Sequence, residues 1–227
     1  ATVDAIIGRE WKVRADREIE KAILEVLQEG SDYPILSEES GDLIGIGKRK
    51  WLVDPLDGTA NFSRGLPLYA ISVGLWESGR PLLGVVLEMP SERLFYGIVN
   101  RGAWCDNDAI QRDSKSSPTA LKAILCTGLP AGMNHSAEEF QALISVFGHF
   151  GKIRMLGSAA LMLCYVASGQ VDSYWERQIA LWDVGAALAI VQAAGGVIEF
   201  SEPDNNNRLE VKAAACEHLL VSKVDGH

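Results

Sequence analysis

The 227-residue sequence predicts a protein of mixed α+β and α/β class, with an antiparallel first sheet and a smaller second α/β lobe. Residues 69–104 contain successive strand-like runs separated by short turns, and such hairpins give antiparallel pairing. From residue 119 onward, strand-like and helix-like runs alternate, as is typical of α/β units. We therefore expect two lobes, residues 1–118 and residues 119–227.

The composition limits the classes of partner. Hydrophobic residues make up 48% of the chain, which is enough to bury a core. A formal charge of −9 argues against a nucleic-acid partner but allows an anionic substrate wherever bound cations invert the local field. No apolar run is long enough to span a bilayer and no signal-peptide pattern opens the chain, so we expect no membrane partner. The four cysteines are scattered with no C-x-x-C spacing, so we expect reduced thiols and a cytoplasmic location.

The first predicted helix covers residues 16–29, where apolar residues recur at helical spacing on one face. Asp16 is a candidate N-cap, and Gly30 is a plausible stop signal. Residues 33–36 then form a short strand that leads into Ser37-Glu38-Glu39-Ser40. The simplest interpretation of Glu38 and Glu39 is a pair of exposed loop acids.

Residues 51–61 contain the largest group of candidate ligand atoms. The apolar run 51–53 should end at Asp54, because Pro55 has no N–H to donate to a ladder. Asp54, the Leu56 carbonyl and Asp57 supply three oxygens of the kind that hard divalent cations bind. Gly58 and the Thr59 N–H could open a helix where an anion is welcome. The alternative is an ordinary turn with solvated aspartates.

The remaining elements follow the same periodicity arguments. Expected strands are residues 69–75, 81–87, 93–99, 102–104, 123–126, 153–156, 171–175 and 197–200, and expected helices are residues 137–147, 158–168 and 184–194. The strand at 171–175 should end at Glu176 and Arg177, which could be an exposed surface pair. Asp183 precedes the last helix, where an aspartate is ordinarily a cap.

Three short motifs carry a family resemblance. Asp54–Thr59 is similar to a DPxDGT signature, Ser37–Ser40 to GEES, and Trp182–Ala186 to WDxAAG. In their order along the chain, Ser37–Ser40 first and Trp182–Ala186 last, they resemble the inositol monophosphatase family, which belongs with fructose-1,6-bisphosphatase to a group of lithium-sensitive, magnesium-dependent phosphatases. The resemblance covers most of the chain and implies a layered αβαβα sandwich.

The resemblance also implies roles for individual residues. The metal ligands would be Glu38, Asp54, the Leu56 carbonyl, Asp57 and Asp183, holding two or three Mg²⁺ ions. Glu38 and Thr59 would hold the attacking water, with Asp16 helping to hold it near the metal site. The substrate would be bound by Asp57, Gly58, Thr59, Ser158, Ala159, Glu176 and Asp183.

An all-oxygen ligand set suits Mg²⁺ and is poor for zinc, so we expect Mg-dependent hydrolysis of a phosphate monoester. The expected route is direct attack by a metal-activated water, and the alternative is a covalent phosphoaspartate at Asp57. The favoured substrate is a small polyol or sugar phosphate, most of all inositol monophosphate. Other candidates are fructose-1,6-bisphosphate, 3′-phosphoadenosine-5′-phosphate and histidinol phosphate, and a candidate of another class is a non-catalytic phospholigand-binding relative.

Two features depart from the family pattern. The sequence begins shortly before Asp16, where relatives usually have a longer helical N-terminus. We therefore expect part of one outer layer to be absent or replaced, with consequences for the expected homodimer and for a flap over the metal site. Gly185-Ala186-Ala187 also stands where the pattern has Ala-Ala-Gly, which concerns helix packing and not ligands.

Overall fold

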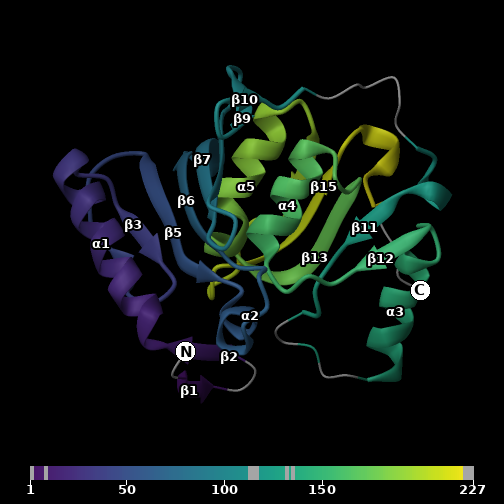
Figure 1. Ribbon diagram of the computed structural model, residues 1–227, viewed down its shortest axis with the longest axis horizontal. Coiled ribbons are helices and arrows are strands. Elements are labelled where there is room, and N and C mark those ends of the chain that lie inside the picture. The colour runs from purple at the N-terminus through teal and green to yellow at the C-terminus, as the bar shows by residue number, and fades with distance from the viewer. Residues whose placement is uncertain (1–2, 8–9, 112–117, 131–132, 134–135, 222–227) are drawn as a thin grey trace.

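The computed structural model describes residues 3–7, 10–111, 118–130, 133 and 136–221. Its elements stack in alternating helical and sheet layers (Figure 1). The order is α1 (Arg14–Gly30), an eight-stranded sheet, the pair α4 (Ala159–Ser168) and α5 (Leu181–Ala193), a five-stranded sheet, and α3 (Ala137–Phe147). The predicted αβαβα class is confirmed.

The first sheet has the strand order β10-β9-β8-β7-β6-β5-β3-β4, and all its pairs are antiparallel except β3 with β5. Its strands are β3 (Ile35–Ser37), β4 (Gly41–Leu43), β5 (Arg49–Asp57), β6 (Ala70–Glu77), β7 (Arg80–Glu88), β8 (Arg93–Ile98), β9 (Gly102–Cys105) and β10 (Asp108–Ala109). The predicted hairpins are therefore present. A separate hairpin of β1 (Val3–Ile7) and β2 (Glu10–Val13) precedes α1.

Strand β5 does not end at Asp54 as expected. It continues through Pro55 to Asp57, and its pairing with β6 shifts register between Asp54 and Asp57. Proline is tolerated at such an irregularity because the ladder there does not need its N–H. The expectation of a strand end at Asp54 is wrong, and both aspartates belong to one irregular strand.

The second sheet has the order β12-β11-β13-β15-β14, with parallel pairing of β11 to its two neighbours and antiparallel pairing elsewhere. Its strands are β11 (Ile124–Cys126), β12 (Lys152–Arg154), β13 (Ser173–Ala180), β14 (Val197–Phe200) and β15 (Arg208–Ala214). Strand β13 passes through Glu176 instead of ending there, and its register against β15 shifts between Glu176 and Ile179.

The main core lies between the two sheets, where α4 and α5 are buried over most of their length. Both helices are apolar on almost every face, as expected for helices enclosed by two layers. The Trp76 indole N–H donates to the Gly185 carbonyl at 2.9 Å, which ties β6 to α5. Short elements complete the fold: α2 (Thr59–Arg64) and two 3₁₀ turns, η2 (Ala120–Lys122) and η3 (Glu217–Leu219).

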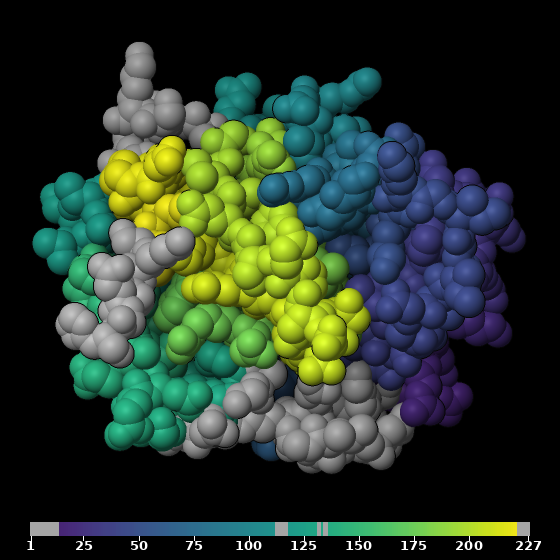
Figure 2. Space-filling view, turned by 180° about the vertical axis from the view of Figure 1, so that it is seen from behind, coloured from purple at the N-terminus to yellow at the C-terminus, as the bar shows by residue number. Residues whose placement is uncertain are grey.

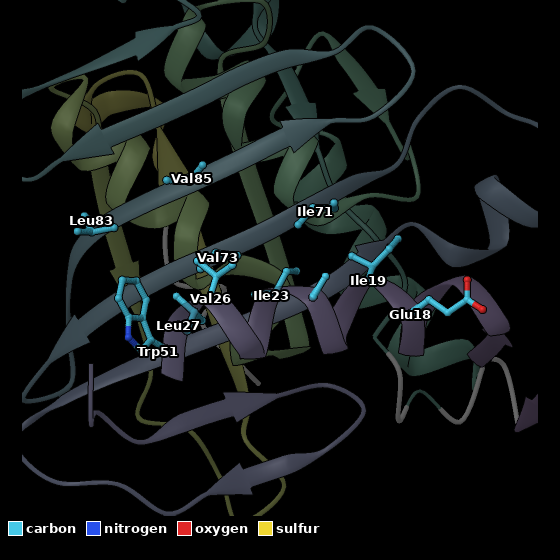
Figure 3. A pocket seen from close by; sticks show the side chains of 11 residues that line it. Glu18, Ile19, Ile23, Val26, Leu27, Trp51, Ile71, Val73, Leu83 and Val85 are labelled. Atoms are coloured by element: carbon cyan, nitrogen blue, oxygen red, sulfur yellow. The ribbon is translucent and has the colours of Figure 1, made fainter. Parts of the chain in front are cut away.

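The outer face of the first sheet is only partly covered. In the described part of the chain, α1 is the one helix on this face, and it packs against β5. Beside it runs a groove of about 720 Å³ between α1 and strands β6 and β7 (Figure 3). Its walls are almost wholly apolar: Ile19, Ala22, Ile23, Val26, Leu27, Trp51, Ile71, Val73, Leu83 and Val85, with Glu18 at one end.

Among the helices that the structure describes, we find none with the length and apolar character needed to cross a bilayer.

Candidate active site

Four acidic side chains from three separate segments approach one another where β5 meets the central helices. Glu38 follows β3, Asp54 and Asp57 lie on β5, and Asp183 lies in the first turn of α5. The Glu38 N–H donates to the Val53 carbonyl at 3.1 Å, which holds Glu38 beside the end of β5.

Asp54 lies at the centre of this group. It is 1% exposed, and the Glu38 carboxyl is within hydrogen-bonding reach of it. Burial raises the pKa of Asp54 well above its usual range, and the charges of Glu38, Asp57 and Asp183 raise it further. Like charges are therefore crowded in a buried place.

Asp57 is held by the start of α4. One carboxylate oxygen accepts from the Ser158 hydroxyl at 2.5 Å and the Ala160 N–H at 2.8 Å, and the other from the Ala159 N–H at 3.2 Å. Burial raises the pKa of Asp57 to about 6, although these three donors oppose the shift. Ser158 and Ala159, expected near the substrate, thus lie in the site in contact with Asp57.

Asp183 does not cap α5. The helix begins at Leu181 with Ala180 as its N-cap, so Asp183 lies inside the first turn. Burial raises its pKa well above the usual range, and the charges of Asp57 and Glu38 add to the shift, while Arg208 opposes it. The capping interpretation is wrong, and Asp183 belongs to the same acidic group.

Within the described ranges, no three His, Cys, Asp or Glu side chains form a compact cage ready for a metal ion. Some of the acidic oxygens already accept from protein donors, as when Asp54 Oδ1 accepts from the Leu56 N–H at 2.9 Å. A carboxylate offers about four acceptor sites, so capacity remains. The Leu56 carbonyl accepts from the Thr59 hydroxyl at 2.9 Å, and its two lone pairs leave room for a further contact. The donor set is all oxygen, and it fits a hard divalent cation.

The turn after Asp57 requires glycine. Gly58 is the N-cap of α2 with φ of 92°, a left-handed conformation, and a Cβ there would lie 2.8 Å from the Leu68 carbonyl oxygen. The predicted helix start after Gly58 is confirmed, since α2 begins at Thr59. No side chain caps this helix, so its first N–H groups are not satisfied by an N-cap side chain.

Asp16 and Glu20 are both buried on α1, with Asp16 only 2% exposed. The helix begins at Arg14, so Asp16 lies inside its first turn and the N-cap interpretation is wrong. Glu20 accepts from the Ser37 hydroxyl, from the Ser40 N–H at 3.0 Å and from the Ser40 hydroxyl at 2.8 Å. Glu20 therefore fixes the turn that carries Glu38, a role that the sequence analysis missed.

Glu176 is buried and does not form an exposed surface pair. It is 7% exposed and accepts from the Tyr174 hydroxyl at 2.8 Å. Burial raises the pKa of Glu176 to about 7, and the nearby charge of Asp57 adds to this, while Tyr174 and Arg208 oppose it. The surface-pair interpretation is wrong, and Glu176 lies near the acidic group.

Asn61 joins the two halves of the chain beside the site. Its side-chain amide donates to the Leu68 carbonyl and to the Leu156 carbonyl, each at 2.7 Å. The sequence analysis gave Asn61 no role, and its partner 95 positions away left no local signal.

Comparison with known proteins gives a consistent result. Residues 12–220 match the model of the inositol monophosphatase family. The chain is 36% identical over 213 residues to inositol-1-monophosphatase of Rhizobium meliloti (strain 1021), covering 92% of this chain and 79% of the relative. It is 34% identical over 192 residues to Nus factor SuhB of Pasteurella multocida (strain Pm70), covering 83% and 71%. The crystal structure of extragenic suppressor protein SuhB from Bartonella henselae superposes with a TM-score of 0.83 at 30% identity, covering 96% and 84%.

Proposed function

Because the chain belongs to the inositol monophosphatase family, whose members are generally metal-dependent phosphatases, we propose that it hydrolyses a small phosphate monoester with Mg²⁺. The observation that carries the proposal is the acidic group of Glu38, Asp54, Asp57 and Asp183, in which burial and the neighbouring acids raise the pKa values of Asp54, Asp57 and Asp183. Carboxylates at this density, with Asp54 and Asp57 buried and the other two half-buried, need protons or cations to offset their repulsion.

The proposed ligands are Glu38, Asp54, the Leu56 carbonyl, Asp57 and Asp183, holding two or three Mg²⁺ ions. Bound Mg²⁺ lowers the pKa of a water and offsets the charge of the phosphate. Glu38 and Thr59 orient the attacking water, and Asp16 supports it.

We favour direct attack by water over a phosphoaspartate at Asp57. Its carboxylate accepts three hydrogen bonds from the start of α4, which bind its lone pairs and weaken it as a nucleophile. Trapping a phosphoaspartate during turnover would contradict this route.

The proposed substrate is a polyol or sugar monophosphate, with inositol monophosphate first. Glu176 is a buried hydrogen-bond acceptor near Asp57, which suits contact with a substrate hydroxyl. Similarity to a protein named inositol-1-monophosphatase supports the same choice. The phosphate would lie beside Gly58, Thr59, Ser158 and Ala159. Fructose-1,6-bisphosphate, 3′-phosphoadenosine-5′-phosphate and histidinol phosphate are the competing substrates.

A phosphate-release screen over inositol, sugar and nucleotide phosphates tests the proposal directly. With Mg²⁺ we expect release from inositol monophosphate, inhibition by millimolar Li⁺, and no release by an Asp54→Asn variant. An active enzyme that is indifferent to Li⁺ would argue against the inositol-phosphatase assignment and for another phosphatase specificity.

A second candidate function is non-catalytic binding of a phospholigand or of another macromolecule, favoured by similarity to proteins named Nus factor SuhB. A binding protein does not need Glu38, the proposed water-orienting acid, so its presence favours hydrolysis. Thermal stabilisation by phosphate esters with no phosphate release from any of them would support this second candidate.

We also propose that the chain is a homodimer and that residues 1–118 and 119–227 form its two lobes. The first sheet is contained in the first range and the second sheet in the second range. Light scattering of the purified chain tests the dimer.

A further inference from the structure

The Glu176 carboxylate is held by groups that the proposed reaction does not use. Tyr174 is completely buried, and its hydroxyl donates to Glu176 Oε2 at 2.8 Å. Residues two apart on a strand project to the same face, so β13 itself aligns this donor with its acceptor. A buried tyrosine hydroxyl needs a partner, and Glu176 supplies it.

Gly128 holds the same carboxylate from a different segment, the loop after β11. Its backbone N–H donates to Glu176. A Cβ on Gly128 would lie 2.6 Å from both Glu176 Cδ and Glu176 Oε2, so any larger residue would force the end of the Glu176 side chain to shift. Gly128 does not have a positive φ, so close approach to the carboxylate is the reason for glycine at this position.

We propose that Tyr174 and Gly128 are positioning residues that hold the Glu176 carboxylate in one orientation and thereby select phosphate esters that carry a hydroxyl group near the phosphate. This inference rests on the proposed function, since it assumes that Glu176 contacts the substrate.

The selectivity follows from the chemistry of a fixed acceptor. In its ionised form Glu176 accepts hydrogen bonds and donates none, and a held carboxylate cannot turn away from a ligand that lacks a donor. A polyol phosphate can donate a hydroxyl to Glu176 in place of solvent. An aryl phosphate excludes solvent from Glu176 without supplying a donor, and sites built around such a polar group reject ligands of this kind.

The first test is Tyr174→Phe, which keeps the ring in the core and removes only the hydroxyl. For inositol-1-phosphate we expect KM to rise by about tenfold, with kcat within about threefold of wild type. For phenyl phosphate we expect neither constant to change. The variant also loses a donor that favours ionised Glu176, so the acid limb of kcat/KM for inositol-1-phosphate should move to higher pH.

The second variant, Gly128→Ala, does not depend on the stability of Tyr174→Phe. The added methyl displaces the end of the Glu176 side chain, so we expect the same rise in KM for inositol-1-phosphate. Tyr165→Phe is the matched control, because the Tyr165 hydroxyl donates to Glu88 at 2.5 Å, a residue to which we assign no part in the reaction. Tyr165→Phe should leave KM and kcat unchanged for both substrates.

A double-mutant cycle tests whether Tyr174 and Gly128 act through Glu176. In a Glu176→Ala background, neither Tyr174→Phe nor Gly128→Ala should change KM for inositol-1-phosphate further. Additive losses in that background, or equal losses on both esters, would overturn the positioning role while leaving the phosphatase assignment intact. A wild-type chain that hydrolyses neither ester would overturn the proposed function, and this inference with it.

Discussion

Strands β5 and β13 both break their ladders where they carry acids proposed for function, but they surround those acids differently. The register of β5 shifts between Asp54 and Asp57, and the register of β13 shifts between Glu176 and Ile179. Such irregularities re-aim side chains and are common beside active sites.

The difference lies in the neighbours. Asp54 is surrounded by other acids, which raise its pKa further after burial has done so. Glu176 instead accepts from the Tyr174 hydroxyl and the Gly128 N–H, and Arg208 opposes the effect of burial on its pKa. Asp54 therefore depends on protons or cations to offset the acids around it, whereas Glu176 has two donors and the Arg208 charge supplied by the chain itself. A burial pattern alone does not separate these two kinds of buried carboxylate, but their partners do.

The strongest test of this comparison is Asp54→Asn. We expect turnover to fall by about 10³-fold or more at saturating Mg²⁺, because a neutral amide is a much poorer ligand for a hard cation. The cation-free variant should be at least as stable to urea as wild type, since one of four repelling charges is gone. Wild-type turnover would remove Asp54 from the proposed ligand set.

Cation binding should be strongly pH-dependent. Since the folded-state pKa of Asp57 is raised to about 6, the cation-free folded chain binds more protons than the unfolded chain between about pH 4 and pH 6. Its stability therefore falls as pH rises through this window. Mg²⁺ competes with those protons, so it should stabilise the chain more at pH 8 than at pH 5. At pH 8, a hundredfold excess of Mg²⁺ over its Kd should add about 2.7 kcal/mol to the free energy of unfolding.

Urea denaturation with EDTA or Mg²⁺ at the two pH values measures this stabilisation. Asp54→Asn serves as the control, and its response to Mg²⁺ should be much smaller. Equal stabilisation of wild type at both pH values would show that protons and Mg²⁺ do not compete for these carboxylates.

Changing the carboxylate of β13 to an amide should reduce activity far less than Asp54→Asn does in β5. For Glu176→Gln we expect KM for inositol-1-phosphate to rise by about tenfold with kcat nearly unchanged, since one hydrogen bond to a charged acceptor is weakened. The stabilisation by Mg²⁺ should equal that of wild type. Loss of the Mg²⁺ response would mean that Glu176 belongs with the acids of β5, and the contrast drawn above would fail.

The smallest expected effect on activity is at Asn61, which joins the two regions. Asn61→Ala removes hydrogen bonds to the Leu68 and Leu156 carbonyls, so the free energy of unfolding should fall by about 1–3 kcal/mol. Exposed Asn205→Ala is the control and should change it by less than about 0.5 kcal/mol. Equal stability of the two variants in urea denaturation would show that the Asn61 bonds carry no net energy.

Local patterns predicted most of the fold. The helix at 137–147 and the strand at 197–200 have the predicted bounds, and the hairpins of the first sheet follow from turn residues between apolar runs. The family resemblance, confirmed by the comparisons, supplied the order of the layers and the list of site acids. Two helices begin earlier than predicted, at Arg14 instead of residue 16 and at Leu181 instead of residue 184, which turned Asp16 and Asp183 from expected caps into first-turn residues.

The supports of the site were harder to predict because their partners are distant in sequence. Glu20 has the charge and spacing of an exposed helix residue, yet it is buried against serines 17 and 20 positions away. Strand β5 passes through Pro55 only because the ladder is irregular there. The contact between Tyr174 and Glu176 could have been predicted, since residues two apart on a strand lie on the same face.

The groove beside α1 affects how the experiments above must be monitored (Figure 3). Fluorescent dyes such as ANS, whose emission rises on apolar surface and which are used to detect partly unfolded proteins, should bind the native chain along this apolar groove. A dye-based melting curve would then start from a bright baseline and hide part of the transition. Circular dichroism or tryptophan emission is the safer readout for this protein.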